Sequence, residues 1–334
     1  MRPARHFLRV RLSYSAAVDV LGDVIMSARV GRPRSARVSW HAPWGQRFPS
    51  VPGSAAFQVL LRGSSWLIRP EAEPVLLGAG DVVFSPNGQG YGMASDPSTP
   101  LAEPRFDPQG VTELVRTDSV GDRGPVTVTL YGGYHLDPVR THPMLRDLPD
   151  VIVLPSRTGQ HPELRAAIDL LGAEIDDPRP GSVAVVPGLL DVLLVYVLRA
   201  WLAQAPTHTS GWAAALTDPG ISEALRALHE EPGRPWTVRE LAGRARMSRA
   251  TFARRFTALI GQPPLRYLTW WRLTSAAHLL RDTDESLERI ANRVGYSSEF
   301  AFATAFKRQH EVAPGRYRRR SRTSHHGADA PGHT

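Results

Sequence analysis

The most constraining feature of this sequence is a pattern that occurs twice near its C-terminus. In the first copy, Thr237 and Glu240 have the spacing of a capping box, in which each side chain binds a backbone N–H group at the start of a helix. Apolar residues follow at helical spacing, a break at 246–248 interrupts them, and Phe252 and Phe256 then stand four residues apart. This order predicts a helix–turn–helix unit.

The second copy starts 49 residues further along the chain. The apolar set Val238, Leu241, Ala242 and Ala245 has its counterpart in Leu287, Ile290, Ala291 and Val294. Phe302 and Phe306 then repeat the pair of phenylalanines. Between the copies, Pro263 and Pro264 precede one long helical pattern, and proline is well tolerated in the first turn of a helix. Because internal duplication is far more specific than a single copy, we expect two helix–turn–helix units joined by a rigid helix.

Positive charge is concentrated in the same part of the chain. Residues 221–322 contain 20 Lys and Arg against 10 Asp and Glu, a net charge of +10, whereas the whole chain of 334 residues carries +8. A basic module beside a near-neutral one indicates a polyanionic partner such as nucleic acid, although a solvated arginine-rich surface has the same composition.

The first half of the chain has the patterns of β-strands. Residues 35–42 alternate polar and apolar side chains, which indicates a strand with one buried face. Further short apolar runs lie at 57–61, 66–68, 74–77, 81–84 and 126–131, and turn residues lie between them. Short strands at this spacing predict an all-β barrel or sandwich.

The period becomes helical after Pro155. Four apolar residues share this spacing, namely Leu164, Ile168, Leu171 and Ile175. A second helix over 189–202 is apolar almost all round, so we expect it to be buried against the barrel, in a dimer interface, or in both. We expect it to be too short for a membrane span, because Asp191 and Arg199 interrupt it.

Two sets of segments resemble a known family. The stretch from Arg289 to Arg319 is similar over its whole length to the signature of the DNA-binding domain of AraC/XylS transcription regulators. Residues 42–45, 56–63 and 80–88 are similar to the cupin-type sensor domain that one branch of this family carries. The resemblance covers nearly the full chain and implies a sequence-specific DNA-binding transcription regulator, not an enzyme.

We therefore expect an α+β protein of two domains. The N-terminal domain is a cupin-like β-barrel with a helical dimerisation segment, and the C-terminal domain is all-α with two helix–turn–helix units. The expected boundaries are 1–160 for the barrel, 161–203 for the dimerisation helices, 204–220 for a linker, 221–320 for the DNA-binding domain and 321–334 for a disordered tail. The absence of cysteine fits a reducing, cytoplasmic location.

A helical wheel selects the residues that would face DNA. With Phe252 and Phe256 on the buried face, the flanking and opposite positions are Arg249, Ala250, Ala253, Arg254, Arg255 and Thr257. We expect Arg254 to reach a base edge, such as O6 and N7 of guanine, and Arg249 and Arg255 to bind phosphates. The corresponding residues of the second unit are Glu299, Phe300, Ala303, Thr304, Lys307 and Arg308.

The second unit departs from the pattern of the family that it resembles. Members often carry Arg where Thr304 stands, so we expect mainly backbone contacts there, through Lys307 and Arg308. Phe300 is unusual on a solvated face and could touch a thymine methyl group or a sugar. Two recognition helices held by one rigid helix would enter successive major grooves, about 34 Å apart.

The barrel lacks the ligands of a cupin metal site. Tyr91 stands where the family's second metal motif has histidine, and the first motif would need two histidines near Gln58. Without two or three imidazoles we expect no catalytic metal, no catalytic residues and no cofactor. The alternative is a cupin metalloenzyme with an accessory DNA-binding domain.

The barrel also has aromatic residues that could bind an effector. They are Trp40, Trp44, Phe57, Trp66 and Tyr91. Such residues also serve as plain core, and a small-molecule effector follows from analogy with the fold. The expected partners are a double-stranded promoter operator, this effector, RNA polymerase and a second copy of the chain in a homodimer, without a membrane.

Overall fold

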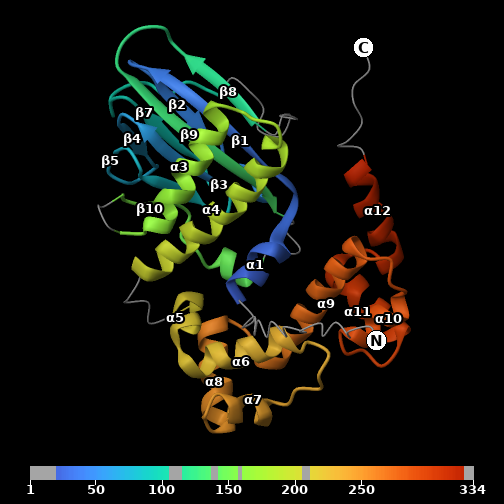
Figure 1. Cartoon of the computed structure of the whole chain (residues 1–334). Helices are drawn as coiled ribbons and strands as arrows, with labels where there is room; N and C mark the ends of the chain where they lie inside the picture. The colour runs from blue at the N-terminus through green and yellow to red at the C-terminus, as the bar shows by residue number, and fades with distance from the viewer. Residues whose placement is uncertain (1–19, 105–114, 137–141, 157–159, 205–210, 327–334) are drawn as a thin grey trace, which may run out of the picture.

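The computed structural model describes residues 20–104, 115–136, 142–156, 160–204 and 211–326. It has a sheet-rich N-terminal domain above a helical C-terminal domain (Figure 1). The predicted α+β architecture of two domains is confirmed.

Ten strands form two sheets in the described part of the N-terminal domain. They are β1 (Arg29–His41), β2 (Gly45–Phe48), β3 (Ser54–Arg62), β4 (Ser65–Ile68), β5 (Val75–Leu77), β6 (Val82–Ser85), β7 (Tyr91–Ala94), β8 (Val115–Val120), β9 (Val126–Leu136) and β10 (Ile152–Leu154). The larger sheet has the order β10-β6-β3-β9-β1-β8, and the smaller one has the order β2-β7-β4-β5. All six predicted strands are present. Strands β2, β7, β8 and β10 were not predicted, because they are short or lack a clear alternation of apolar residues.

The larger sheet is buried on both faces because its strands alternate between two cores. In β3, Leu60 packs with residues of the smaller sheet such as Leu67 and Met93. Its neighbours Phe57 and Val59 point the other way, into a core shared with α3 (Pro162–Asp176) and α4 (Ser182–Gln204). These two helices cross the outer face of the larger sheet (Figure 1).

The other helices lie at the junction of the domains and in the C-terminal domain. They are α1 (Val20–Ala28), α2 (Pro143–Arg146), α5 (Gly211–Thr217), α6 (Pro219–Glu230), α7 (Val238–Arg244), α8 (Arg249–Ile260), α9 (Pro264–Asp282), α10 (Leu287–Arg293), α11 (Glu299–His310) and α12 (Pro314–His326). Helices α7 and α8 form the first predicted helix–turn–helix unit, α10 and α11 form the second, and α9 joins them (Figure 1).

Helix α4 corrects the prediction of a short helix over 189–202. It begins at Ser182, seven residues earlier, and its segment Ser182–Ala203 is long and apolar enough to cross a membrane by length and composition alone. Core helices of globular proteins can have the same properties. In this structure α4 packs against α3, β1 and β10.

The segment predicted as a linker also contains structure. Helix α5 lies within 204–220, and its Trp212 is buried against the first helix–turn–helix unit and the His142 ring. The prediction overlooked this helix because polar residues precede it and Asp218-Pro219-Gly220 follows it. Helix α12 likewise continues to His326, into the predicted disordered tail, whose residues 327–334 lie outside the described ranges.

The two domains share one continuous hydrophobic core. It includes Leu145 and Leu148 of the N-terminal domain, Trp212 of α5, and Leu228 and Leu268 of the C-terminal domain. Helix α1 packs on α6 and α9, while α5 packs on α8. The first helix–turn–helix unit is therefore docked on the N-terminal domain. The second has a separate core built around Phe302 and Phe306.

Candidate functional site

Local capping interactions define the two helices of the first unit. Thr237 accepts a hydrogen bond from the Glu240 N–H group at 3.2 Å, and the Thr237 N–H group donates to the Glu240 carboxylate at 2.8 Å, which completes the predicted capping box. Ser248 caps α8 by accepting from the Thr251 N–H group, and Gly261 ends α8 in the left-handed conformation. Such caps stabilise a helix end by about 1 kcal/mol and define where α8 begins and ends.

The second unit has the same construction. Ser286 and Ser298 cap α10 and α11 by accepting backbone N–H hydrogen bonds. Phe302 and Phe306 are fully buried, as are Phe252 and Phe256 in the first unit. The buried faces of both predicted recognition helices are therefore confirmed.

Helix α8 presents most of its predicted DNA-facing residues to solvent. Arg249, Ala250 and Arg254 are exposed, whereas Ala253 and Thr257 are half-buried. Among the described residues, neither Arg249 nor Arg254 has an ion-pair or hydrogen-bond partner. Both guanidinium groups are therefore available to a ligand outside the protein.

Arg255 has a partner within the protein. Its guanidinium group forms an ion pair with Asp218, a buried carboxylate that also caps α6 by accepting from the N–H groups of Gly220 and Ile221. This contact couples α8 to α6 and competes with the phosphate-binding role that we predicted for Arg255. The partner lies 37 positions away in the sequence, so a helical wheel does not reveal it.

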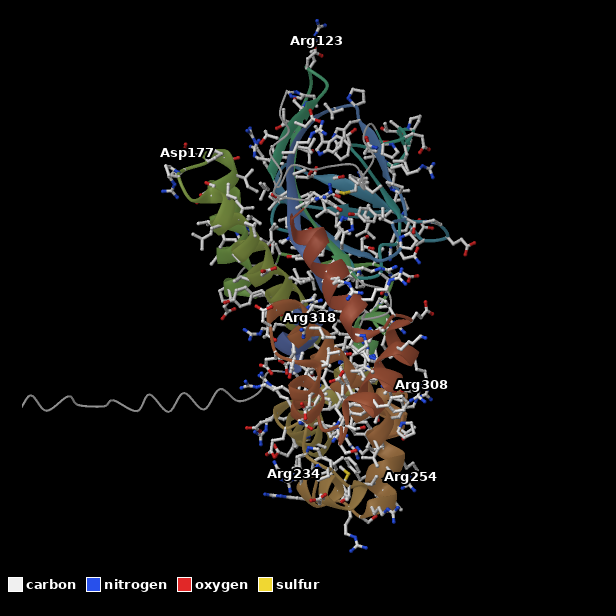
Figure 2. The ribbon with its side chains drawn as sticks, turned by 90° about the vertical axis from the view of Figure 1, so that its right-hand side faces the viewer. Arg123, Asp177, Arg234, Arg254, Arg308 and Arg318 are labelled. Carbon is white, nitrogen blue, oxygen red and sulfur yellow. The ribbon has the colours of Figure 1, made fainter. Side chains whose placement is uncertain are left out.

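Helix α11 also presents its predicted residues. Glu299, Phe300, Thr304, Lys307 and Arg308 are exposed, and Ala303 is half-buried. Phe300 is 82% exposed, the highest value among the large hydrophobic side chains of the described residues. Arg308 of α11 and Arg254 of α8 extend toward the same side of the C-terminal domain (Figure 2).

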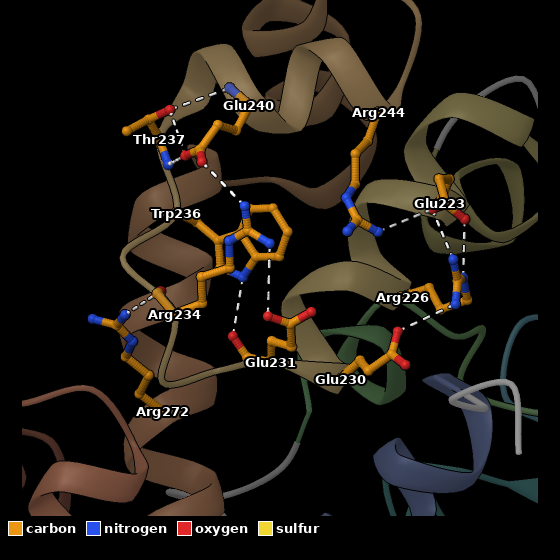
Figure 3. A network of polar contacts seen from close by, with 10 residues as sticks. All are labelled: Glu223, Arg226, Glu230, Glu231, Arg234, Trp236, Thr237, Glu240, Arg244 and Arg272. Carbon is orange, nitrogen blue, oxygen red and sulfur yellow. Dashed lines mark hydrogen bonds and ion pairs between the residues drawn. The ribbon is translucent and has the colours of Figure 1, made fainter. Parts of the chain in front are cut away.

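A network of polar contacts stabilises the start of the first helix–turn–helix unit (Figure 3). Two guanidinium groups lie over the Trp236 ring, with Arg234 at 4.2 Å and Arg244 at 5.1 Å from its centroid. Arg272 of α9 donates to the carbonyl groups of Pro232 at 2.6 Å and Arg234 at 2.8 Å. The loop before α7 is thereby tied to the helix that joins the two units. This role of Arg272 was not predicted, because no local pattern in the sequence indicates it.

The two sheets enclose a cavity of about 120 Å³. Of the five aromatic residues predicted to bind an effector, Trp40 and Tyr91 line it. Trp44 stacks on Trp40 with ring centroids 4.8 Å apart but is absent from the lining. Phe57 points into the helix-side core, and Trp66 lies half-buried on β4 outside the lining.

A hydrogen-bond chain runs through Tyr91 and Gln58 on the cavity wall. The Tyr91 hydroxyl donates to Gln58 Oε1 at 3.1 Å, and Gln58 Nε2 donates to Thr129 Oγ1 at 3.4 Å. Trp40 Nε1 donates to the same hydroxyl at 2.8 Å. Burial raises the pKa of Tyr91, so the phenol stays protonated. Within the described ranges, no group of three or more His, Asp or Glu residues is placed to hold a metal ion.

A second hydrogen-bond chain crosses the interface between the domains. His142 Nδ1 accepts from the Met144 N–H group at 3.1 Å, so in the neutral ring Nε2 carries the proton and donates to the Tyr267 hydroxyl at 3.1 Å. Tyr267 can then donate to His229 Nε2 at 2.6 Å, and His229 Nδ1 donates to Asp23 at 2.9 Å. This assignment satisfies every group with both histidines neutral. Residues 23 and 142 belong to the N-terminal domain, whereas 229 and 267 belong to the helical domain.

Known protein families match two separate parts of the chain. A family described as cupin matches residues 19–203, and one described as a helix-turn-helix domain matches residues 241–320. The chain is 35% identical over 305 residues to a putative AraC-like transcription regulator of Streptomyces lividans, covering 90% of this chain and 98% of the relative.

Two further matches span other parts of the chain. The HTH-type transcriptional regulator AlkR of Acinetobacter baylyi is 33% identical over 273 residues, covering 79% of this chain and 87% of the relative. A crystal structure of the DNA-binding domain of AdpA in complex with a target DNA is 37% identical, with a TM-score of 0.30, and covers 32% of this chain and 96% of that one.

Proposed function

Because the chain belongs to the AraC family of DNA-binding transcription regulators, with a cupin-like N-terminal domain, we propose which of its residues read DNA. Arg254 of α8 reads a base edge, and Arg249 binds a phosphate. On α11, Phe300 makes an apolar contact, while Lys307 and Arg308 bind the backbone. The observation that carries this proposal is the exposure of Arg254 and Arg308 on one side of the domain (Figure 2).

Contacts to bases and contacts to phosphates affect DNA affinity differently, so a binding measurement can distinguish them. A guanidinium group that forms two hydrogen bonds to guanine contributes about 1–3 kcal/mol of discrimination at one base pair. A phosphate contact instead adds affinity on every sequence, and each one contributes roughly −0.9 to the slope of log K against log salt concentration. Arg254 belongs to the first class, and Lys307 belongs to the second.

The test starts from an operator located by footprinting the DNA that flanks the gene. Fluorescence anisotropy then measures affinity for this operator and its single-base variants. Arg254→Ala should weaken specific binding by about 1–3 kcal/mol and relax preference at one position. Lys307→Ala should weaken binding to all variants alike and reduce the salt slope by about 1.

Arg165→Ala is the matched control, because it removes the same charge from an exposed position of the sensor domain. We expect it to leave operator binding unchanged. A uniform loss across base variants for Arg254→Ala would make this residue a phosphate contact. Unchanged affinity would remove α8 from the proposed interface.

The other features of the proposal concern the sensor domain. A small molecule in the barrel cavity shifts the balance between two arrangements of the domains, and it can do so only if its affinity differs between them.

The protein acts in the cytoplasm as a homodimer without enzymatic activity, and RNA polymerase is a further partner at the promoter. The half-exposed apolar face of α4 supports the dimer, because such faces are typical of helix–helix interfaces.

A further inference from the structure

The barrel cavity contains a cation for which the described residues provide no counter-ion. Arg34 lines the cavity from β1, and its buried Nη1 atom has no hydrogen-bond partner among the residues that the structure describes. Among the described lining residues the one carboxylate is Asp118, which binds Arg116 at 3.0 Å. The third lining arginine, Arg47, pairs with Glu103 at 3.0 Å. Burying an unpaired charge is costly, so Arg34 is a candidate binding site for an anion.

Two uncharged polar groups lie beside this cation. Arg34 pairs with Gly133 across the β1–β9 ladder, which places the Tyr131 and His135 side chains on either side of it along the cavity face. Burial and the Arg34 charge lower the pKa of His135, so its ring is neutral near pH 7. Burial raises the pKa of Tyr131 against the opposing effect of Arg34, so its hydroxyl keeps a proton to donate. The cation is thus accompanied by hydrogen-bonding groups that add no charge.

The rest of the lining limits the size and polarity of a ligand. Val38, Trp40 and Phe48 supply apolar and aromatic walls. The volume of about 120 Å³ is slightly below that of an engineered cavity of about 150 Å³ that holds benzene. The cavity therefore fits a compact body of about one six-membered ring.

We propose that the cavity binds a compact organic carboxylate, with its carboxylate group on Arg34 and its apolar body against Trp40 and Phe48. The planar guanidinium group suits carboxylate because it can form two parallel hydrogen bonds with it. A neutral ligand of the same shape leaves Arg34 unpaired. This inference rests on the proposed effector role of the barrel and names the chemical class of that effector.

Matched acids and amides test the proposal on the full-length protein. Isothermal titration calorimetry near neutral pH compares benzoate with benzamide and cyclohexanecarboxylate with cyclohexanecarboxamide. Each amide has nearly the shape of its acid but no charge. At least one acid should bind about tenfold or more tightly than its amide, because a hydrogen bond to a charged group contributes about 1.5–3 kcal/mol.

Substitutions test whether Arg34 causes the preference for acids over amides. Arg34→Met should abolish the difference in affinity between acid and amide. Arg34→Lys should retain part of this difference, because lysine keeps the charge but lacks the planar guanidinium group that can donate two parallel hydrogen bonds. Arg37→Met is the matched control. Arg37 lies three residues along the same strand, faces away from the cavity and pairs with Asp176 of α3 at 2.5 Å. We expect this control to keep the full preference for acids.

Three outcomes would overturn the proposal. They are equal binding of acids and amides, no binding of any acid at millimolar concentration, and a preference for acids that survives Arg34→Met in a folded protein. A measurement of operator affinity distinguishes failure of the proposed ligand class from failure of the proposed effector role. If an acid binds with the expected preference but leaves operator affinity unchanged, the effector role fails and the ligand class stands. If only a neutral compound alters operator affinity, the effector role stands and the carboxylate proposal fails.

Discussion

At the scale of single residues, backbone conformation limits what the turns of the two units can accept. Arg246 and Gly295 hold equivalent places in the two turns, and both are left-handed, with φ of 55° and 83°. Glycine adopts this conformation without the cost that a side chain incurs. Space is also limited at Gly295, where an added Cβ atom would lie 2.6 Å from the Gly233 carbonyl oxygen and 2.8 Å from the Arg272 guanidinium group.

Gly295→Ala should therefore destabilise the protein by about 2 kcal/mol or more, as the sum of backbone strain and a collision with backbone atoms. Gly243→Ala is the control, because Gly243 lies inside α7 and an added Cβ atom would meet nothing within 4 Å. We expect the control to stabilise the helix by about 0.5–1 kcal/mol. Chemical denaturation followed by circular dichroism measures both changes. Equal effects of the two substitutions would contradict the assigned role of Gly295.

At the scale of the helix, exposure separates residues that stabilise a recognition helix from those available to a ligand. In α11, Phe302 and Phe306 are buried, while Phe300 is 82% exposed. A large apolar side chain in water contributes little to folding and becomes favourable only when a partner covers it. Its position at the start of α11 makes DNA the proposed partner.

Phe300→Ala should change the free energy of unfolding by less than about 0.5 kcal/mol, as is usual for exposed sites. It should weaken operator binding by about 1 kcal/mol or more, because the apolar contact is lost. Thermal unfolding and fluorescence anisotropy provide the two readouts. Leu76→Ala is the control, since Leu76 is also exposed, at 57%, but lies on β5 of the barrel. A large loss of stability without loss of DNA binding would make Phe300 a structural residue.

Helix α4 has an apolar stripe that the described parts of the chain leave uncovered. Val185, Leu189, Val192 and Tyr196 recur at alternating spacings of four and three residues and are exposed or half-buried. This spacing is typical of a helix–helix contact. The opposite side of α4, with Leu190, Leu193 and Val197, lies in the core. The same helix can thus anchor the barrel and supply the proposed dimer interface.

Val192→Asp should convert the dimer to a monomer, because a charge at the centre of an apolar interface is left desolvated. Sedimentation velocity measures the change in oligomeric state. Leu76→Asp makes a similar substitution on the far sheet and should leave the dimer intact. If Val192→Asp is dimeric at the same concentrations as the unaltered protein, the stripe is not the interface.

At the scale of the whole molecule, buried histidines link domain docking to pH. Burial, the His229 ring and the Arg146 guanidinium group hold the pKa of His142 well below its usual value of 6.5. Burial also lowers the pKa of His229, although its hydrogen bond to Asp23 opposes the shift. Both rings are thus neutral in the folded protein at pH values where an unfolded chain would already bind protons.

Stability should therefore be greatest above about pH 6.5 and decrease as the pH falls below it, by up to about 1.4 kcal/mol per histidine over the first pH unit. His142→Gln should reduce this dependence, because glutamine does not titrate and His229 alone then contributes. His41→Gln, at the other end of β1 from the domain interface, should retain it. Thermal unfolding between about pH 7.5 and 5.5 measures the effect. A protein that is equally stable across this range would contradict the assignment.

The sequence alone determined the features that depend on neighbouring residues. The duplicated apolar period located both helix–turn–helix units, Thr237 and Glu240 identified a helix start, and the alternation over 35–42 identified a strand. Burial of one helix face follows from a period of 3.6 residues. The wheel therefore placed Arg254 and Phe300 on exposed surfaces without further information.

The tertiary structure decided which distant groups meet. It paired Arg255 with Asp218, turned Phe57 away from the cavity and left Arg34 inside it with no counter-ion in the described part of the chain. It also packed α5, which lies in the segment predicted as a linker, against α8. These outcomes depend on strand register and on helices packing across the domain boundary. Such contacts join residues far apart in the chain, and local periodicity carries no information about them.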